Sequence, residues 1–444
     1  MKMNVLLTIG LFVCLACQLF VGVRSSEDTG GMDDDDDDDA GLPFVTWDCN
    51  DMIPDLCSLD VTTGTFVSTC QGKLLEIAYW IYQPSSSMGS DKLPLVVVNG
   101  GPGMSHDYVT PLKQLACRGR QVIFYDQGGT GKSSIPDNKT IVDDYPCLLD
   151  VSYYASELGQ LIESLDLDQF HLYGDSYGTQ LALQFALHGP EAAKSRMLSL
   201  MLQNPIPSSA GYIKAQWDPH EGTVGRLPPY LQTRIRALIK ADAFDSAEYE
   251  QIDTFLTTDF FYRSGIIPDC ALPSLVGKNI EIYAGMQGPS EYSEFTGTLR
   301  DFDVMSQLST LSHLPVLIGS GEYDFVRPST VAAMHAQLPL SEVHYYLGSG
   351  HSTLYDAMEL VLADSHDFMD RVETSMATNS PFQPMSSASD VDAENDAKCW
   401  TAWSSSWQHS SMVVFTLVVG GVIGFWSGRR SAMFGNGSYQ QITP

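Results

Sequence analysis

The stretch HLYGDSYGTQLALQFA, residues 171–186, places one serine between two glycines, after a short apolar run and before a run with helical spacing. Its centre, GDSYG, fits the pattern G-x-S-x-G, which requires a strand before it and a helix after it. A tight turn of this kind exposes the serine hydroxyl, which becomes a nucleophile when a base takes its proton. We therefore predict that Ser176 is a nucleophile, with a small-residue packing turn as the alternative.

Other apolar runs repeat the form of a strand followed by glycine. They are LPLVVVNGGPG (93–103), RQVIFYDQGG (120–129), LPVLIGSGEYD (314–324) and SEVHYYLGSGH (341–351). Continuous apolar runs are typical of strands buried on both faces of a parallel sheet. Apolar residues recur at helical spacing over residues 154–165, which lie between two strands, and over residues 354–372, which follow the last strand. The alternation predicts an α/β protein with a mainly parallel, doubly wound sheet.

The chain between the two groups of strands has a different texture. Residues 205–295 form helical stretches rich in Tyr, Gln and acidic residues, with few buried-strand runs. We predict a helical cap here, inserted between a first core segment (43–204) and a second core segment (296–373).

The base and acid of a serine nucleophile are expected after later strands, in the order Ser, Asp, His. Asp324 ends one strand-like run, and His351 follows another with glycines beside it. We predict that His351 takes the proton of Ser176 and that Asp324 orients the imidazole. Asp301 and Asp303 are the alternative acids.

The oxyanion formed by such an attack needs backbone N–H donors, one after the serine and one from an earlier glycine loop. Tyr177 follows the serine directly, and Gly101 lies in the loop NGGPG at the end of residues 93–103. We predict that these two residues form the oxyanion hole.

Composition, charge and missing motifs argue against nucleic-acid binding, nucleotide binding and metal binding. The net charge of −30 includes seven aspartates at residues 33–39, and acidity argues against nucleic acid as a partner. GGTGKS (128–133) resembles a phosphate loop, but Asp126 stands where that motif has glycine. No C-x-x-C pair occurs after the predicted signal peptide, which itself contains Cys14 and Cys17. We predict no cofactor, no metal and no nucleotide site.

The ends of the chain predict targeting segments. The run before residue 25 is apolar and reads as a signal peptide, with an uncleaved anchor as the alternative. MVVFTLVVGGVIGFWSG is uncharged and is followed by two arginines, which favours a type I membrane helix over a lipid-anchor signal. The predicted segments are a signal peptide (1–25), an acidic linker (26–42), a stalk (374–411), a transmembrane helix (412–428) and a cytoplasmic tail (429–444).

Seven of the nine cysteines remain after signal cleavage, and an oxidising compartment would favour disulfides. Cys49, Cys57 and Cys70 cluster ahead of the first strong strand and are expected to staple the N-terminal extension. The odd count leaves Cys399 as a candidate for a disulfide-linked dimer. Asn138 begins the sequon NKT and is a candidate glycosylation site.

Several motifs together resemble one known family. They are GGPGMSHDYV (100–109), YDQGGTGKSSIPD (125–137), YGDSYGTQLAL (173–183), GPSEYSEFTGTLRDFDV (288–304) and GSGEYDFVRP (319–328). They resemble the proline iminopeptidase family, which includes the tricorn-interacting aminopeptidase, and the resemblance runs over residues 72–369. It implies an α/β-hydrolase fold with a helical cap. It also implies an enzyme that releases N-terminal residues, often proline, from peptides.

The resemblance also implies a site for the substrate's free amine, and here the sequence departs from the family. Glu291 matches the acidic residue of the cap motif, although Glu294 could take its place because the segment is one residue longer. Phe325 stands directly after the predicted triad aspartate, where the family often has a second acid. Asn99 replaces the histidine that usually precedes Gly-Gly-Pro-Gly.

We therefore predict a cofactor-free serine aminopeptidase that releases N-terminal proline or another small apolar residue from short peptides through an acyl-enzyme. Two alternatives are an amidase or esterase on the same fold and a catalytically silent binding ectodomain. The predicted location is a single-pass type I membrane protein of the cell surface or of the endosomal or lysosomal membrane, with a lumenal or extracellular catalytic domain.

Overall fold

An eight-stranded sheet in the order β1-β2-β4-β3-β5-β6-β7-β8 organises the molecule. The structure is a computed structural model that describes residues 48–85, 92–136, 139–265 and 267–385. β1 pairs with β2 and β2 with β4 in antiparallel register, and all later pairs are parallel. The strands are β1 (Leu59–Cys70), β2 (Lys73–Pro84), β3 (Leu95–Val98), β4 (Val122–Tyr125), β5 (Phe170–Asp175), β6 (Met197–Gln203), β7 (Val316–Gly321) and β8 (Ser341–Tyr346).

The central strands are buried on both faces, which is why their sequences read as continuous apolar runs. Every residue of β3, β4, β5 and β7 is buried. Such strands need helices on both sides of the sheet, because neither face meets water. The prediction of a mainly parallel, doubly wound α/β sheet is thus confirmed.

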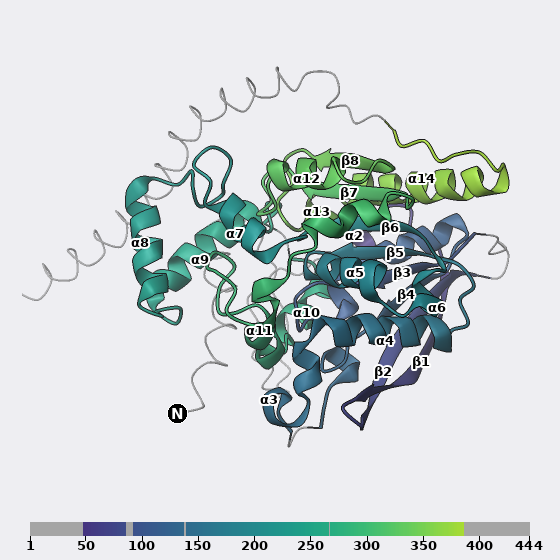
Figure 1. The fold of residues 1–444 in the computed structure, drawn as a ribbon, viewed down its shortest axis with the longest axis horizontal. Helices are drawn as coiled ribbons and strands as arrows, with labels where there is room; N and C mark the ends of the chain where they lie inside the picture. Colours follow the sequence, from purple (N-terminus) through teal and green to yellow (C-terminus); the bar gives the residue numbers. More distant parts are fainter. Residues whose placement is uncertain (1–47, 86–91, 137–138, 266, 386–444) are drawn as a thin grey trace, which may run out of the picture. The chain divides into compact units, whose positions relative to one another are not determined.

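Helices cover the two faces of the sheet (Figure 1). Alternate strand residues such as Leu95, Val97 and Phe124 pack with η1 (His106–Arg118) and α14 (Met358–Ala377) in one core. On the other side, α5 (Tyr177–His188) lies against β5 and β6, with α4 (Val151–Ser164) beside it. The other helical segments outside the chain between β6 and β7 are short. They are α2 (Cys49–Met52), η2 (Gly131–Ser133), α3 (Ile141–Asp144), η3 (Pro146–Leu149), α6 (Glu191–Lys194), α12 (Pro328–His335) and α13 (Thr353–Asp356).

Among the described residues between β6 and β7, helices joined by loops are the regular elements, apart from an isolated β-bridge between Ser208 and Asp303. The helices are α7 (Ser209–Gln216), α8 (Pro229–Lys240), α9 (Ala247–Phe260), η4 (Asp269–Ala271), α10 (Leu272–Val276), α11 (Ile280–Met286), η5 (Thr298–Asp301) and η6 (Met305–Leu311). The exact boundaries predicted for the cap and the two core segments stay a prediction.

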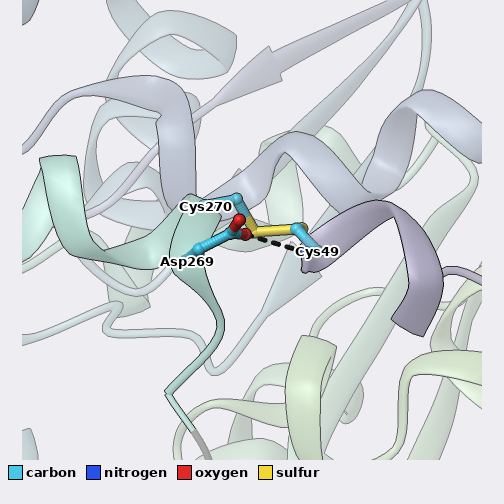
Figure 2. A group of neighbouring side chains, drawn as sticks. All are labelled: Cys49, Asp269 and Cys270. Atoms are coloured by element: carbon cyan, nitrogen blue, oxygen red, sulfur yellow. Dashed lines mark hydrogen bonds between the residues drawn. A yellow bond between two sulfur atoms is a disulfide. The ribbon is translucent and has the colours of Figure 1, made fainter. Parts of the chain in front are cut away.

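Within the described ranges, three disulfides tie the N-terminal extension to the rest of the fold. They join Cys49 to Cys270, Cys57 to Cys117 and Cys70 to Cys147. Asp269 lies beside the first of these, and its Oδ1 accepts the Cys49 N–H at 2.8 Å (Figure 2). The three side chains have the spacing of metal ligands. Both sulfurs are used in the disulfide, however, so a single carboxylate is left, which is too little for a metal site.

The predicted localisation as a type I membrane protein is wrong on these findings. No helix within the described ranges is long and apolar enough to cross a membrane. The longest, α14, buries one face in the core and carries charged residues such as Glu359 and Asp367 on the other. The predicted signal peptide, linker, transmembrane helix and tail, the stalk from residue 386 onward, Cys399 and Asn138 lie outside the described residues.

Candidate active site

Ser176 lies in a strained turn between β5 and α5. Its backbone has φ 55° and ψ −123°, a conformation that an L-residue adopts only where surrounding structure enforces it. The flanking glycines make the turn possible: a Cβ on Gly174 would lie 2.5 Å from the Gly178 carbonyl oxygen, and one on Gly178 would lie 2.4 Å from the Val98 oxygen. The sequence thus places the serine hydroxyl at the carboxyl end of the parallel strands, where open α/β sheets hold their ligands.

The structure brings Ser176, His351 and Asp324 into one hydrogen-bonded chain. His351 Nε2 lies 2.8 Å from Ser176 Oγ, and His351 Nδ1 lies 2.6 Å from Asp324 Oδ1. Asp324 is fully buried, and its carboxylate also accepts the Val326 N–H at 3.0 Å. With neutral His351, Nδ1–H donates to the carboxylate and Nε2 is free to accept the serine proton.

Two opposing effects set the basicity of His351. Burial alone would lower the pKa of the imidazole, but the charge and hydrogen bond of Asp324 outweigh burial and raise it above its ordinary value. Aromatic rings enclose the imidazole, with Phe261 at 5.0 Å and Phe325 at 5.9 Å between centroids. His351 is therefore buried among aromatic rings, next to a buried carboxylate.

The glycine loop lies directly against the serine turn. A Cβ on Gly100 would meet the Asp175 carbonyl oxygen at 2.8 Å and the Ser176 Cβ at 3.0 Å. Gly101 has φ 127°, which glycine adopts at little cost. The buried Asn99 amide donates to the carbonyl oxygens of Gly100 and Met104 at 3.1 and 2.8 Å. Asn99 thus holds the glycine loop together, and Tyr177 begins α5 on the other side of the serine.

The alternative acids lie elsewhere. Asp301 is exposed and pairs with its neighbour Arg300. Asp303 accepts hydrogen bonds from the Ser208 hydroxyl at 3.1 Å and the Met305 N–H at 3.0 Å. Neither carboxylate contacts His351, whose Nδ1 is bound by Asp324.

The two predicted amine-binding residues differ in their surroundings. Glu291 is half-buried, and its carboxylate accepts the Tyr283 hydroxyl at 2.5 Å and the Tyr212 hydroxyl at 3.5 Å. Burial raises the pKa of Tyr212, and the charges of both Glu291 and Asp324 raise it further. Tyr212 is thus a direct partner of Glu291 that also feels the charge of Asp324. Glu294 is exposed and has no comparable environment.

Sequence reasoning missed two charged residues beside Glu291. Burial, followed by the charge of Glu291, raises the pKa of Asp253 in α9 to about 6. Burial lowers the pKa of Lys278, against the opposing charges of Glu291 and Asp253. The Lys278 Nζ lies 3.9 Å from the centroid of the Tyr283 ring. No sequence signal marks these residues, because each is a single charge, Asp253 within α9 and Lys278 between α10 and α11.

Comparisons with known proteins agree with this architecture. Residues 94–357 match the family model described as alpha/beta hydrolase fold. A proline iminopeptidase of Clostridium botulinum is 33% identical over 61% of this chain and 87% of its own length. That of Lactobacillus helveticus is 30% identical over 68% of this chain and 98% of its own length.

A solved structure gives the same fold. The crystal structure of a proline iminopeptidase from Mycobacterium smegmatis superposes with a TM-score of 0.61, at 24% identity, over 70% of this chain and all of that one. At this identity the match shows the fold, and the more similar sequences show the family. The chain belongs to the proline iminopeptidase family, aminopeptidase-type hydrolases with the alpha/beta hydrolase fold.

Proposed function

We propose that the protein is a serine aminopeptidase that releases N-terminal proline or another small apolar residue from short peptides. The observation that carries this proposal is the hydrogen-bonded chain from Ser176 through His351 to Asp324. It joins a nucleophile, a base and an orienting acid in the arrangement used for acyl transfer.

In the proposed acylation, Ser176 Oγ attacks the carbonyl carbon of the first peptide bond, and its proton passes to His351 Nε2. The oxyanion that forms is held by the N–H groups of Gly101 and Tyr177. The C–N bond then breaks, and His351 returns the proton to the leaving amine. Asp324 keeps the imidazole oriented and stabilises its charged form throughout.

Deacylation repeats these steps with water. A water molecule gives a proton to His351 and attacks the ester carbon, the bond to Ser176 Oγ breaks, and the serine recovers its proton. The enclosing rings of Phe261 and Phe325 keep other water away from the imidazole.

For the amine of the substrate we propose Glu291 as the partner. A half-buried carboxylate that already accepts two tyrosine hydroxyls is a fixed acceptor for an ammonium group. Glu294 is not required in this proposal, because it faces solvent. The apolar Phe325, where a second acid would stand, supports the one further candidate, an amidase or esterase without amine recognition.

The test is hydrolysis of fluorogenic proline, alanine and leucine amides, with free and with blocked amines, by the full chain and by Ser176→Ala. Cleavage restricted to free-amine substrates and abolished in Ser176→Ala supports the aminopeptidase. Equal cleavage of blocked substrates replaces it with the amidase or esterase. Cleavage that survives in Ser176→Ala removes the serine mechanism.

A further inference from the structure

Asp175, the residue before the nucleophile, has a buried carboxylate that the mechanism above does not use. Its side chain is 8% exposed. Tyr108 donates its hydroxyl proton to Asp175 Oδ2 at 2.8 Å, and the Asn204 amide donates to Asp175 Oδ1 at 3.1 Å. The pattern G-x-S-x-G leaves this position open, so its chemistry here is specific to the chain. A buried carboxylate is costly unless it is satisfied, and this one binds through both oxygens.

One of these contacts leads to the glycine loop. The Tyr108 hydroxyl accepts the N–H of Gly100 at 2.5 Å. Since the hydroxyl has one proton and uses it toward Asp175, the carboxylate fixes the direction of this hydrogen bond. Gly100 precedes Gly101, the proposed oxyanion donor, so Tyr108 connects Asp175 to the oxyanion loop.

The other contact leads to the base. The amide nitrogen of Asn204 also donates to the backbone carbonyl of His351 at 2.5 Å and lies 3.3 Å from Thr353 Oγ1. Asn204 follows β6 directly and has φ 55°, so its side chain is aimed by a strained backbone. It therefore connects Asp175 to the loop that carries His351.

We propose that Asp175 is a positioning residue that holds the oxyanion loop and the His351 loop in register with Ser176. The inference rests on the proposed function, because its readout is turnover by Ser176. Small displacements of reacting groups lower rates strongly even when the substrate still binds. A residue that holds the serine turn, the oxyanion loop and the His351 loop together should affect turnover more than substrate binding.

The charge of Asp175 gives the proposal a second readout. Together with Asp324 it raises the pKa of His351. Burial raises the pKa of Asp175 itself to about 6, against the opposing effects of His351 and of its hydrogen bonds. The other titratable groups around this carboxylate are Asp324, Tyr108, Tyr173, Tyr262 and Tyr355.

The test compares the full chain with Asp175→Asn, Tyr108→Phe and the double variant on a free-amine amide. An asparagine has the same size but presents a nitrogen donor to either Tyr108 or Asn204. We expect kcat to fall about 10- to 100-fold in Asp175→Asn with KM within about twofold of the wild type. The acid limb of the pH profile should move to lower pH, because the charge that raises the pKa of His351 is gone. The double variant should lose less than the product of the single losses.

Tyr154→Phe is the matched control, since this buried tyrosine donates to the carbonyls of Gly128 and Leu148, which belong to neither loop of the site. Its kcat should stay within about twofold of the wild type. A wild-type kcat in Asp175→Asn, or losses that multiply independently in the cycle, overturns the inference while leaving the proposed function intact. If Asp175→Asn does not fold, a wild-type kcat in Tyr108→Phe is by itself enough to overturn the inference. An inactive wild type instead removes the proposed function.

Discussion

The Asp324 carboxylate and the His351 imidazole meet at 2.6 Å, in a position where the carboxylate is fully buried. A carboxylate in such a place has no solvent to replace a lost partner, so the pair behaves as one unit. Asp324 comes from the loop after β7 and His351 from the loop after β8. Parallel pairing of these neighbouring strands is what brings the two side chains together.

Replacing Asp324 with asparagine should lower kcat by about 10⁴-fold, because an amide holds the imidazole in the wrong tautomer. Steady-state kinetics on a free-amine proline amide measures the loss. Asp303→Asn is the matched control, since Asp303 accepts hydrogen bonds from Ser208 and Met305 instead. Similar losses in both variants would reopen the assignment of the acid.

Activity should fall at acid pH as His351 becomes protonated. The base must be neutral to accept the serine proton, and the pKa of His351 lies above its ordinary value of 6.5. The rate is therefore full above that raised pKa and lost as the pH falls through it. The profile of kcat/KM from about pH 5 to pH 9 gives the midpoint, which we expect above 6.5. A profile flat down to pH 5, with the protein still folded, contradicts the prediction.

Glu291→Gln should lower kcat/KM for free-amine substrates by about 10- to 100-fold, because a charged hydrogen bond to the ammonium is lost. Blocked substrates should be affected far less, which separates amine recognition from damage to the triad. Glu294→Gln is the control of the same chemistry on an exposed residue of the same segment. Equal losses on free and blocked substrates would mean that Glu291 acts on the fold instead.

A buried ion network at the opposite end of the strands should control stability. Arg120 is fully buried and donates to Glu373 and Asp370, and His171 lies 3.1 Å from Glu373. Burial alone would raise the pKa of Glu373, but hydrogen bonds from His171 and Arg120 outweigh it and lower the pKa to about 2. Glu373→Gln should lower the free energy of unfolding by about 2–4 kcal/mol at pH 7.

The pH dependence of that loss has a defined sign. A carboxyl whose pKa is lowered by folding stabilises the protein above its unfolded pKa of about 4.3. The contribution disappears as the pH falls through the folded value of about 2. Urea unfolding at pH 7 and near pH 4 should therefore show a smaller difference between wild type and Glu373→Gln at the lower pH. Exposed Glu359 on the same helix provides the control, Glu359→Gln, with a change under about 0.5 kcal/mol.

Local patterns in the sequence predicted three side chains that the structure joins by hydrogen bonds. Ser176, Asp324 and His351 each follow an apolar run that forms a strand. Their order in the chain predicts their roles as nucleophile, acid and base. The same local signal predicted the buried strands β3, β4, β5 and β7, because a strand covered on both faces must be apolar throughout.

Contacts between distant segments could not be predicted in this way. Cys49 pairs with Cys270 across 221 residues, and no spacing rule connects them. Glu291 and Glu294 look equivalent in the sequence, yet tertiary contacts bury one and expose the other. Hydropathy at the ends of the chain led to the membrane assignment, which the structure of the described residues does not support.

The backbone of His351, the proposed catalytic base, is bound to the predicted cap. The Phe260 carbonyl at the end of α9 accepts the His351 N–H at 2.7 Å, and the Phe261 carbonyl accepts the Ser352 N–H at 2.9 Å. The cap of this protein is therefore not an exchangeable module. A chimera carrying another relative's cap would change the substrate pocket. It would also remove the hydrogen bonds that hold the backbone of His351, the proposed proton-transfer group. Altering specificity without losing turnover calls for changes within the cap helices that leave the Phe260–Phe261 backbone in place.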